Sequence, residues 1–269
     1  MQTTMQTDLT INDAVSPDLT ASVQHSVSEQ EWQMRVNLAA CYRLIAAYGW
    51  DDLVFTHISA RVPNTENEFL INPYGLLFEE ITASNLIKVN QNGEKISPSA
   101  YDVNPAGFTI HSAVHEARDD AHCVIHLHTG DGVAVSTQEQ GLLPISQQSL
   151  FPLSNLAYHN YEGIALNPAE KVRLVADLGS ASFMILRNHG LLTCAGTVAD
   201  AFLYMYIMQK ACEIQIKAQS GGNALIPIPE QILAGIQAAS KQVTKEANGD
   251  IAWPALLRKL RRTDPSFEQ

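Results

Sequence analysis

Two histidines, His126 and His128, stand one residue apart in an otherwise apolar stretch. On a strand, residues i and i+2 project from the same face, roughly 7 Å apart along the backbone, so both rings can share one ion. A third histidine, His189, follows a second apolar run at residues 183–186. Three imidazoles with an open position are typical of a catalytic Zn²⁺ site, although Mn, Fe and Co accept the same ligand. The alternative is a pair of structural histidines that hydrogen-bond at a strand end.

The spacing of apolar residues indicates which elements would position these histidines. Short apolar runs at residues 123–128 and 183–186 predict buried strands. Residues 53–62, 69–73 and 86–90 predict a small meander of strands. Elsewhere the apolar residues recur at helical spacing, which predicts helices. Ser28 and Glu31 form a capping box at the start of the first of them. These helices cover residues 29–48, 105–118, 130–138, 168–178 and 198–219.

The two ends of the chain are expected to lie outside the main domain. Residues 1–28 are polar and unpatterned, which predicts a flexible, extended or disordered arm. Glycines and prolines near residue 222 mark a boundary, so one domain is predicted over residues 29–222. Residues 223–269 are then a C-terminal helical extension, with a weak helix at 231–241 and a basic helix at 253–262. We expect the basic helix to dock on the acidic body, the alternative being a membrane or partner site.

Composition excludes several classes of partner. The 269 residues carry 28 acidic and 17 basic side chains, a formal charge of −11, which argues against nucleic acid and anionic membranes. Apolar residues make up 46% and charged residues only 17%, so part of the outer surface is expected to be buried against other subunits. Four scattered cysteines, no basic leader and no long apolar run favour a cytoplasmic protein with reduced thiols and no membrane span.

The strings VIHLHT (residues 124–129) and FMILRNHGLL (183–192) together resemble the class II aldolase/adducin family. Flanking phrases such as INPYGLLFEEITASNLIKV (71–89) and NPAGFTIHSAVHEAR (104–118) are more similar to the adducin-head branch than to the sugar-phosphate aldolases. The resemblance implies an α/β fold, a three-layer α/β/α sandwich with a central, mostly antiparallel sheet, often assembled as a C4 tetramer. It also implies that His126, His128 and His189 bind Zn²⁺ or another divalent transition metal.

The chain departs from the aldolase pattern where the family places its catalytic base. The family's Glu at the start of the helix before the H-x-H strand corresponds to Gly107 here. The phosphate loop of the aldolases corresponds to residues 56–59, where only Ser59 survives, together with Gly75 in the INPYG string. Ser59 and Gly75 are therefore candidate substrate-binding residues. Classical cleavage of sugar phosphates is not expected.

A different acid or base would have to replace that Glu, and several side chains are candidates. His111 and His115 share one helix face, where plain helix packing is the alternative; Tyr158 and His159 are otherwise a surface or interface pair. Arg187, directly before the Asn-His-Gly corner, is a candidate for binding an anionic substrate, with a salt bridge to Asp or Glu as the alternative. The remaining candidates are His57 and Asp131.

Two functions follow from these observations. The first is a metal-dependent lyase-like enzyme, of aldolase, decarboxylase or dehydratase type, acting on a small hydroxy- or oxo-acid. The second is a non-catalytic, adducin-head-like oligomeric binding module with a vestigial metal site. Retention of all three histidines favours the enzyme, while Gly107 favours the module. A homo-oligomer, most simply a tetramer, is expected in both cases.

Overall fold

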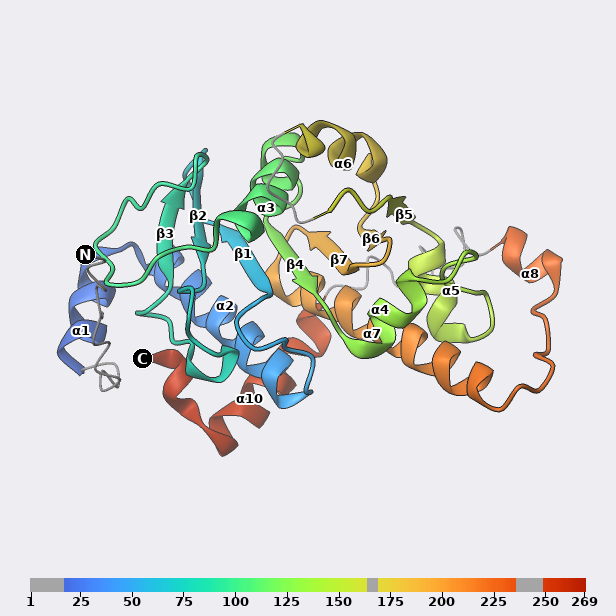
Figure 1. Ribbon diagram of the computed structural model, residues 1–269. Coiled ribbons are helices and arrows are strands. Elements are labelled where there is room, and N and C mark those ends of the chain that lie inside the picture. The colour runs from blue at the N-terminus through green and yellow to red at the C-terminus, as the bar shows by residue number, and fades with distance from the viewer. Residues whose placement is uncertain (1–16, 164–168, 236–248) are drawn as a thin grey trace, which may run out of the picture.

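The computed structural model describes residues 17–163, 169–235 and 249–269, and its centre is a seven-stranded sheet. The strand order is β3-β2-β1-β4-β7-β6-β5, and every neighbouring pair is antiparallel except β5 and β6. The strands are β1 His57–Arg61, β2 Glu68–Ile71, β3 Ile87–Asn90, β4 Cys123–Leu127, β5 Leu156–His159, β6 Phe183–Leu186 and β7 Gly190–Ala195. The mostly antiparallel sheet predicted from the sequence is confirmed (Figure 1).

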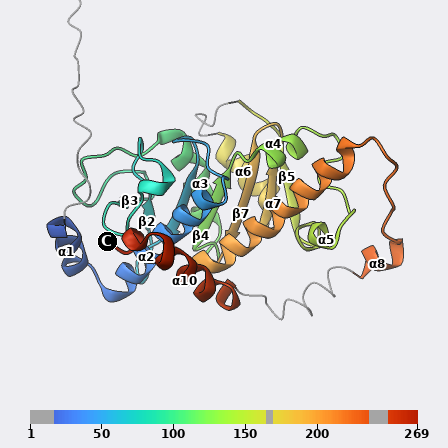
Figure 2. The same ribbon diagram turned by 90° about the horizontal axis from the view of Figure 1, so that it is seen from below.

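Helices cover both faces of the sheet, which gives the predicted three layers. Helices α2 (Glu29–Ala47), α7 (Val198–Ser220) and α10 (Trp253–Thr263) lie on one side, nearest the viewer in Figure 2. Helices α3 (Pro105–Ala117) and α6 (Glu170–Leu178) pack together on the other side. The shorter helices are α1 Pro17–Ser26, α4 Gly130–Ser136, α5 Gln147–Leu153 and α8 Glu230–Ala234, with 3-10 turns η1 Phe78–Glu80, η2 Gly249–Ile251 and η3 Pro265–Glu268.

Alternation along β4 assigns its side chains to the two layers. Cys123, Ile125 and Leu127 join the core formed with α2 and α7. Val124 joins the smaller core beneath α3 and α6, and by the two-residue period His126 projects to that same face. All five residues of β4 are buried because β1 and β7 flank it on both edges. The centre of the sheet therefore holds His126 in a fixed position.

The start of α2 is partly as predicted. Ser28 caps the helix and accepts a hydrogen bond from the backbone N–H of Glu31 at 3.1 Å. The Glu31 carboxylate does not complete a capping box; it accepts from Arg35 Nε at 3.0 Å and from Lys88 Nζ at 2.7 Å. Arg35, 2% exposed, also donates to the carbonyls of Ala83 and Leu86. Burying Arg35 requires the opposite charge beside it, which is why Glu31 is drawn away from the cap.

The N-terminal arm differs from the prediction. Residues 17–26 form α1, so an extended or disordered arm is wrong for that part, while residues 1–16 lie outside the described residues. Pro17 occupies the first helical turn, where its missing N–H costs nothing. Val23 and Val27 then pack against the main core, which stabilises the helix on the body.

The C-terminal extension docks as expected, but through different contacts. Trp253, Leu260 and Phe267 are buried against the α2 side of the core. Of the basic residues, Lys259 Nζ lies 4.7 Å from the Tyr48 ring centroid, and Arg261 pairs with Glu268 of the extension itself. In place of the predicted helix at 231–241, α8 ends at Ala234 with Gly235 as its C-cap, and residues 236–241 lie outside the described residues. No helix among the described residues is long and apolar enough to cross a membrane.

Candidate metal centre

Three histidines from two separate segments of the chain meet at one end of the sheet. His126 lies on β4, His128 directly follows β4, and His189 lies in the turn between β6 and β7. Their Nε2 atoms converge: His126 is 2.9 Å from His128 and 3.3 Å from His189. We call these residues the triad. Among the described residues, the triad is the one group of three or more His, Cys, Asp or Glu side chains whose ligand atoms converge, all within 4.8 Å.

The turn that carries His189 is built by its two neighbours. Asn188 adopts a left-handed backbone conformation, with φ of 56°, and its N–H donates to the carbonyl of Ser136. At Gly190 a Cβ atom would lie 2.4 Å from the carbonyl oxygen of Leu127. No side chain fits there, so glycine allows β7 to start directly against β4. His189 is thereby held beside the end of the strand that carries His126.

Hydrogen bonds at the outer nitrogens fix how two of the triad rings are protonated. His126 Nδ1 lies 3.0 Å from the carbonyl oxygen of Leu191, and His128 Nδ1 lies 3.0 Å from a carboxylate oxygen of Asp52. Both oxygens accept and cannot donate, so each Nδ1 carries the proton. Each Nε2 then directs a lone pair inward. An acceptor behind a histidine is the usual support of a metal ligand.

Burial keeps two rings of the triad, His126 and His189, uncharged. Burial is the main cause and the neighbouring histidines add to it: the pKa of His126 lies well below its ordinary value, and the pKa of His189 is lowered to about 4. Neutral imidazole is the form that binds a metal. Inward lone pairs on neutral imidazoles repel one another unless a cation lies between them. The residues present therefore fit a divalent transition metal, with an open side because His128 and His189 are only partly buried.

Asp52 was not among the residues predicted from the sequence. It lies in the loop between α2 and β1, and its partner His128 is 76 positions further along the chain. Nothing local distinguishes Asp52 from Asp51 beside it. Only the folded loop brings the carboxylate behind the imidazole.

A second set of buried polar groups lies beneath α3, on the same face of the sheet as His126. The hydroxyl oxygen of Ser59 is 2.7 Å from His111 Nδ1 and 2.7 Å from His115 Nε2. His115 Nδ1 lies 2.8 Å from the carbonyl oxygen of Ala121. We call His111, Ser59 and His115 the buried chain. Ser59 is 1% exposed, so its hydroxyl faces these two rings and not solvent.

His57 lies between the triad and the buried chain. It pairs in register with His126 across β1 and β4, and its ring makes an edge-to-face contact with His111 at 5.9 Å between centroids. A Cβ atom at position 107 would lie 2.2 to 2.4 Å from three atoms of the His57 ring. The place where the aldolase pattern has Glu, Gly107 here, is thus filled by the imidazole of His57.

Among the remaining candidates, three side chains contact partners of their own. His159 Nδ1 is 2.7 Å from a carboxylate oxygen of Asp177 on α6, and the Tyr158 hydroxyl accepts from the N–H of Leu142. Asp131, at the start of α4, faces Gln209 at 3.5 Å. Gly75 occupies an exposed turn with φ of +102°. These contacts leave Tyr158 and His159 with structural partners.

The side chain of Arg187 contacts backbone carbonyls and an aromatic ring. Its guanidinium donates to the carbonyls of Gln138 and Glu139 and lies 4.5 Å from the ring centroid of Tyr158. Within the described part of the chain, no carboxylate forms an ion pair with it, so the salt-bridge alternative is wrong. Carbonyls of the loop before α5 satisfy Arg187 instead.

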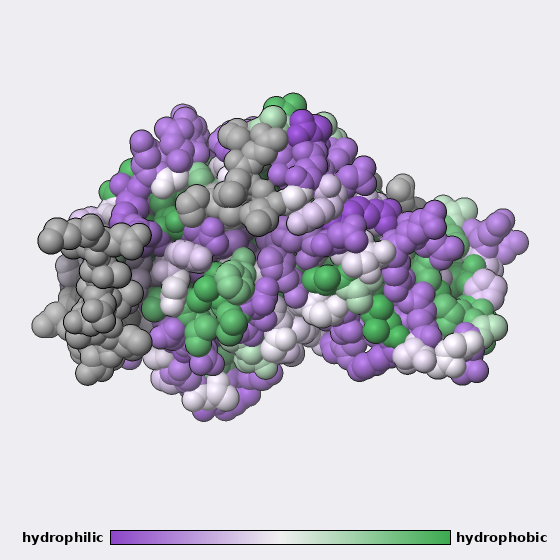
Figure 3. Space-filling view, in the orientation of Figure 1, coloured by the Kyte–Doolittle hydropathy of each residue, from purple (hydrophilic) through white to green (hydrophobic). Residues whose placement is uncertain are grey.

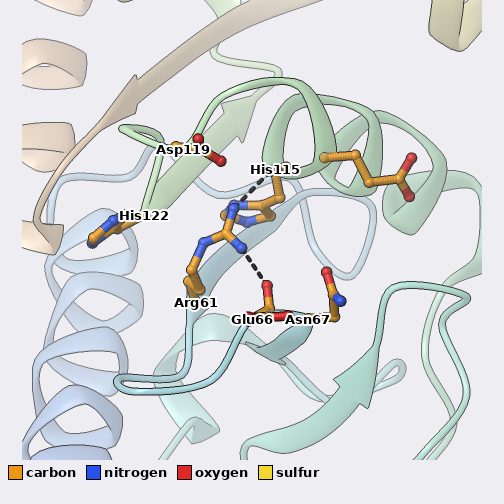
Figure 4. A pocket seen from close by; sticks show the side chains of 7 residues that line it. Arg61, Glu66, Asn67, His115, Asp119 and His122 are labelled. Atoms are coloured by element: carbon orange, nitrogen blue, oxygen red, sulfur yellow. Dashed lines mark hydrogen bonds between the residues drawn. The ribbon is translucent and has the colours of Figure 1, made fainter.

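A polar pocket of about 430 Å³ lies at the other end of β1 from His57. Figure 4 shows Arg61 at its centre, donating to the carbonyl oxygens of Glu66 and His115. The lining residues are Arg61, Glu66, Asn67, His115, Glu116, Asp119 and His122. The pocket does not include the triad, but His115 connects it to the buried chain.

Residues 36–216 match the family model described as class II aldolase and adducin N-terminal domain. A protein of Pseudomonas aeruginosa provisionally named an aldolase class 2 protein is 61% identical over 254 residues, 93% of this chain and 98% of that protein. Mouse alpha-adducin is 45% identical over 210 residues, 76% of this chain but 28% of adducin. The crystal structure of an aldolase II superfamily protein from Pseudomonas syringae superimposes with a TM-score of 0.89 at 50% identity, covering 92% of this chain and all of that one.

Proposed function

The chain belongs to the class II aldolase and adducin family, and on that basis we propose that it is a metal-dependent lyase-like enzyme. The proposed substrate is a small hydroxy- or oxo-acid, and the reaction is of aldolase, decarboxylase or dehydratase type. The observation that carries this proposal is the convergence of the three triad imidazoles at one point. Acceptors behind His126 and His128 direct their inner lone pairs to one point, together with His189.

His126, His128 and His189 would hold the metal, with Asp52 and the carbonyl of Leu191 fixing two of the rings. Three imidazoles favour Zn²⁺, although other divalent transition metals fit the same ligands. When bound, such an ion polarises a carbonyl or carboxylate oxygen and stabilises negative charge next to it. The residues of the chain supply the orientation: β4 fixes two rings and the Asn188–Gly190 turn fixes the third.

Sugar phosphates are not the proposed substrates. Gly107 provides no carboxylate, and the space beyond it holds the ring of His57. Ser59, the surviving member of the phosphate loop, is 1% exposed and engaged by two histidines. Gly75 remains a proposed substrate contact. A phosphate group would thus find few free hydrogen-bond donors here. A carboxylate does not need them, because the bound metal itself would be its partner.

A non-catalytic, adducin-head-like module is the second candidate. The similarity to alpha-adducin supports it, as does the glycine at position 107. The match covers only 28% of adducin, so the roles of the rest of adducin are not proposed for this chain. The triad argues for the enzyme, because a purely structural module has no need of three unbridged imidazoles.

We further propose a homo-oligomer, most simply a C4 tetramer, in the cytoplasm. Large apolar side chains are exposed in the loop beside Asp52, Leu53 at 62% and Phe55 at 51%. Figure 3 shows apolar areas of this kind between polar ones on the face drawn. Covering them with another subunit would lower the exposed apolar area. The four cysteines are free and buried, which agrees with a reducing compartment.

Metal-loaded protein tested by NMR against a panel of small 2-hydroxy and 2-oxo acids separates the two functions. The enzyme proposal expects conversion of at least one acid, dependent on added metal and absent from a His189→Ala variant. Protein that holds the metal and converts none of them would favour the module.

A further inference from the structure

His57 is a buried imidazole that lacks hydrogen-bond partners. It is 4% exposed, and neither ring nitrogen has a hydrogen-bond partner among the described residues. A buried polar group without a partner destabilises the fold, so such a group calls for an explanation. The ring fills the space over Gly107, where any side chain would collide with it. The first turn of α3 is therefore shaped to admit this ring.

The ring of His57 lies on the triad's side of the sheet. Residues paired in register on neighbouring antiparallel strands direct their side chains to the same face, and His57 pairs with His126. Burial, together with a smaller contribution from nearby His128 and His189, lowers the pKa of His57 to about 4. A neutral His57 has one ring N–H, which can donate a hydrogen bond, and one unprotonated ring nitrogen, which can accept one; we call such an unprotonated nitrogen bare.

The hydrogen bonds of the buried chain determine which nitrogen of His111 is unprotonated and can accept a hydrogen bond from His57. The carbonyl of Ala121 can only accept, so His115 Nδ1 carries a proton and His115 Nε2 is bare. The Ser59 hydroxyl must then donate to His115 Nε2, and its oxygen accepts from His111 Nδ1. His111 Nε2 is left bare, fully buried and without a partner among the described residues. The ring that it meets edge-on is His57.

We propose that His57 contacts the substrate at the triad through a bare ring nitrogen, which accepts a hydrogen bond from a substrate hydroxyl. A small rotation of the ring directs the N–H of His57 to the bare Nε2 of His111, leaving the other nitrogen for the substrate. The inference rests on the proposed function and narrows it: hydroxy-acids should bind better than the matching oxo-acids. His111, Ser59 and His115 act as positioning residues, because they set the direction in which His57 donates.

The test uses full-length protein loaded with Co²⁺, whose visible spectrum reports binding without turnover. L-lactate and pyruvate are titrated into wild type, His57→Ala, His57→Gln and a control variant, His25→Gln, which alters an exposed histidine on α1. His57→Ala should keep the metal but weaken lactate binding about fivefold to tenfold, the size of one hydrogen bond, with pyruvate little changed. His57→Gln, whose amide oxygen can accept, should recover part of the loss. The control should behave as wild type.

The outcomes separate this inference from the proposed function. A His57→Ala variant with the wild-type ratio of lactate to pyruvate affinity overturns the role of His57 and leaves the proposed function standing. Wild-type protein that takes up no Co²⁺, or binds neither acid when loaded, contradicts both.

A second measurement needs no substitution at His57. Long-range ¹H–¹⁵N spectra of metal-free protein distinguish the two neutral forms of each histidine ring. Both His111 and His115 should carry the proton on Nδ1. A proton on His111 Nε2 would mean that His111 cannot accept a hydrogen bond from His57. This result would overturn the inference even if every variant misfolded.

Discussion

The triad and the buried chain are both made of buried histidines, yet their hydrogen bonds differ. In the buried chain, donors and acceptors alternate from Ala121 through His115 and Ser59 to His111, so the protein itself supplies a partner for every one of these groups except His111 Nε2. In the triad, acceptors behind the rings turn two bare nitrogens toward each other at 2.9 Å, with no donor assigned between them. The outer hydrogen bond, and not the residue type, therefore decides whether a histidine serves the fold or a ligand.

This comparison predicts opposite results for substitutions in the two regions. Replacing His189 by Ala should lower metal affinity by more than about 100-fold, more than the loss of an outer support, because a ligand itself is removed. The free energy of unfolding of metal-free protein should change little, since a repulsive neighbour disappears. Isothermal titration with Zn²⁺ and denaturant unfolding measure the two quantities. Unchanged affinity would remove His189 from the centre.

Asp52 tests whether the outer support matters. Asp52→Ala should lower metal affinity about 10-fold to 100-fold by releasing the His128 ring. Asp52→Asn should lie between, because its amide oxygen can still accept from Nδ1. The control is Asp51→Ala, which removes the neighbouring carboxylate. Equal affinities for Asp52→Ala and the control would show that the pairing with His128 has no role in holding the ion.

Ser59 gives the converse test. Ser59→Ala leaves the N–H of His111 buried without an acceptor, which should lower the free energy of unfolding by about 1 to 3 kcal/mol. Metal stoichiometry should be retained. Ser220→Ala, an exposed serine at the end of α7, serves as control and should stay within about 0.5 kcal/mol of wild type in denaturant unfolding. A Ser59→Ala protein as stable as the control would mean that the buried chain contributes no net stability.

The smallest effect is the dependence of stability on pH. Burial lowers the pKa of His115 to about 3 and that of His111 well below 6.5. The unfolded chain then binds protons that the folded chain does not, so stability is complete above pH 6.5 and falls as the pH drops toward 3. Each histidine should contribute on the order of 0.7 kcal/mol between pH 7 and pH 6. His115→Gln should make this decline shallower in metal-free protein; an unchanged slope would contradict the burial argument.

The centre of the fold was predictable because its signals are local. The apolar runs of β4 and β6 and the two-residue spacing of His126 and His128 are visible in the sequence. Strands β5 and β7 were not predicted. Strand β5 is a half-exposed edge strand of four residues, and β7 begins directly after the turn that carries His189, without a separating signal. The sequence Ser16-Pro17 is a typical helix start and would have indicated α1, but the polar composition of residues 1–28 favoured an arm without a helix.

The contacts that complete the site could not be predicted, since each joins distant parts of the chain. Asp52 meets His128 across 76 positions, and the His57 ring fills the space over Gly107 on another element. Sequence spacing identifies residues that share one strand or helix. It cannot show that one side chain occupies the space left by a missing one.

The metal content of protein purified without chelators tests the central claim most directly. Wild type should contain about one transition metal ion per chain, with Zn²⁺ the most abundant, as three neutral imidazoles with an open position favour. The double variant His126→Ala/His128→Ala should be folded and free of that metal. A double variant that retains the wild-type content would contradict the assignment of the triad.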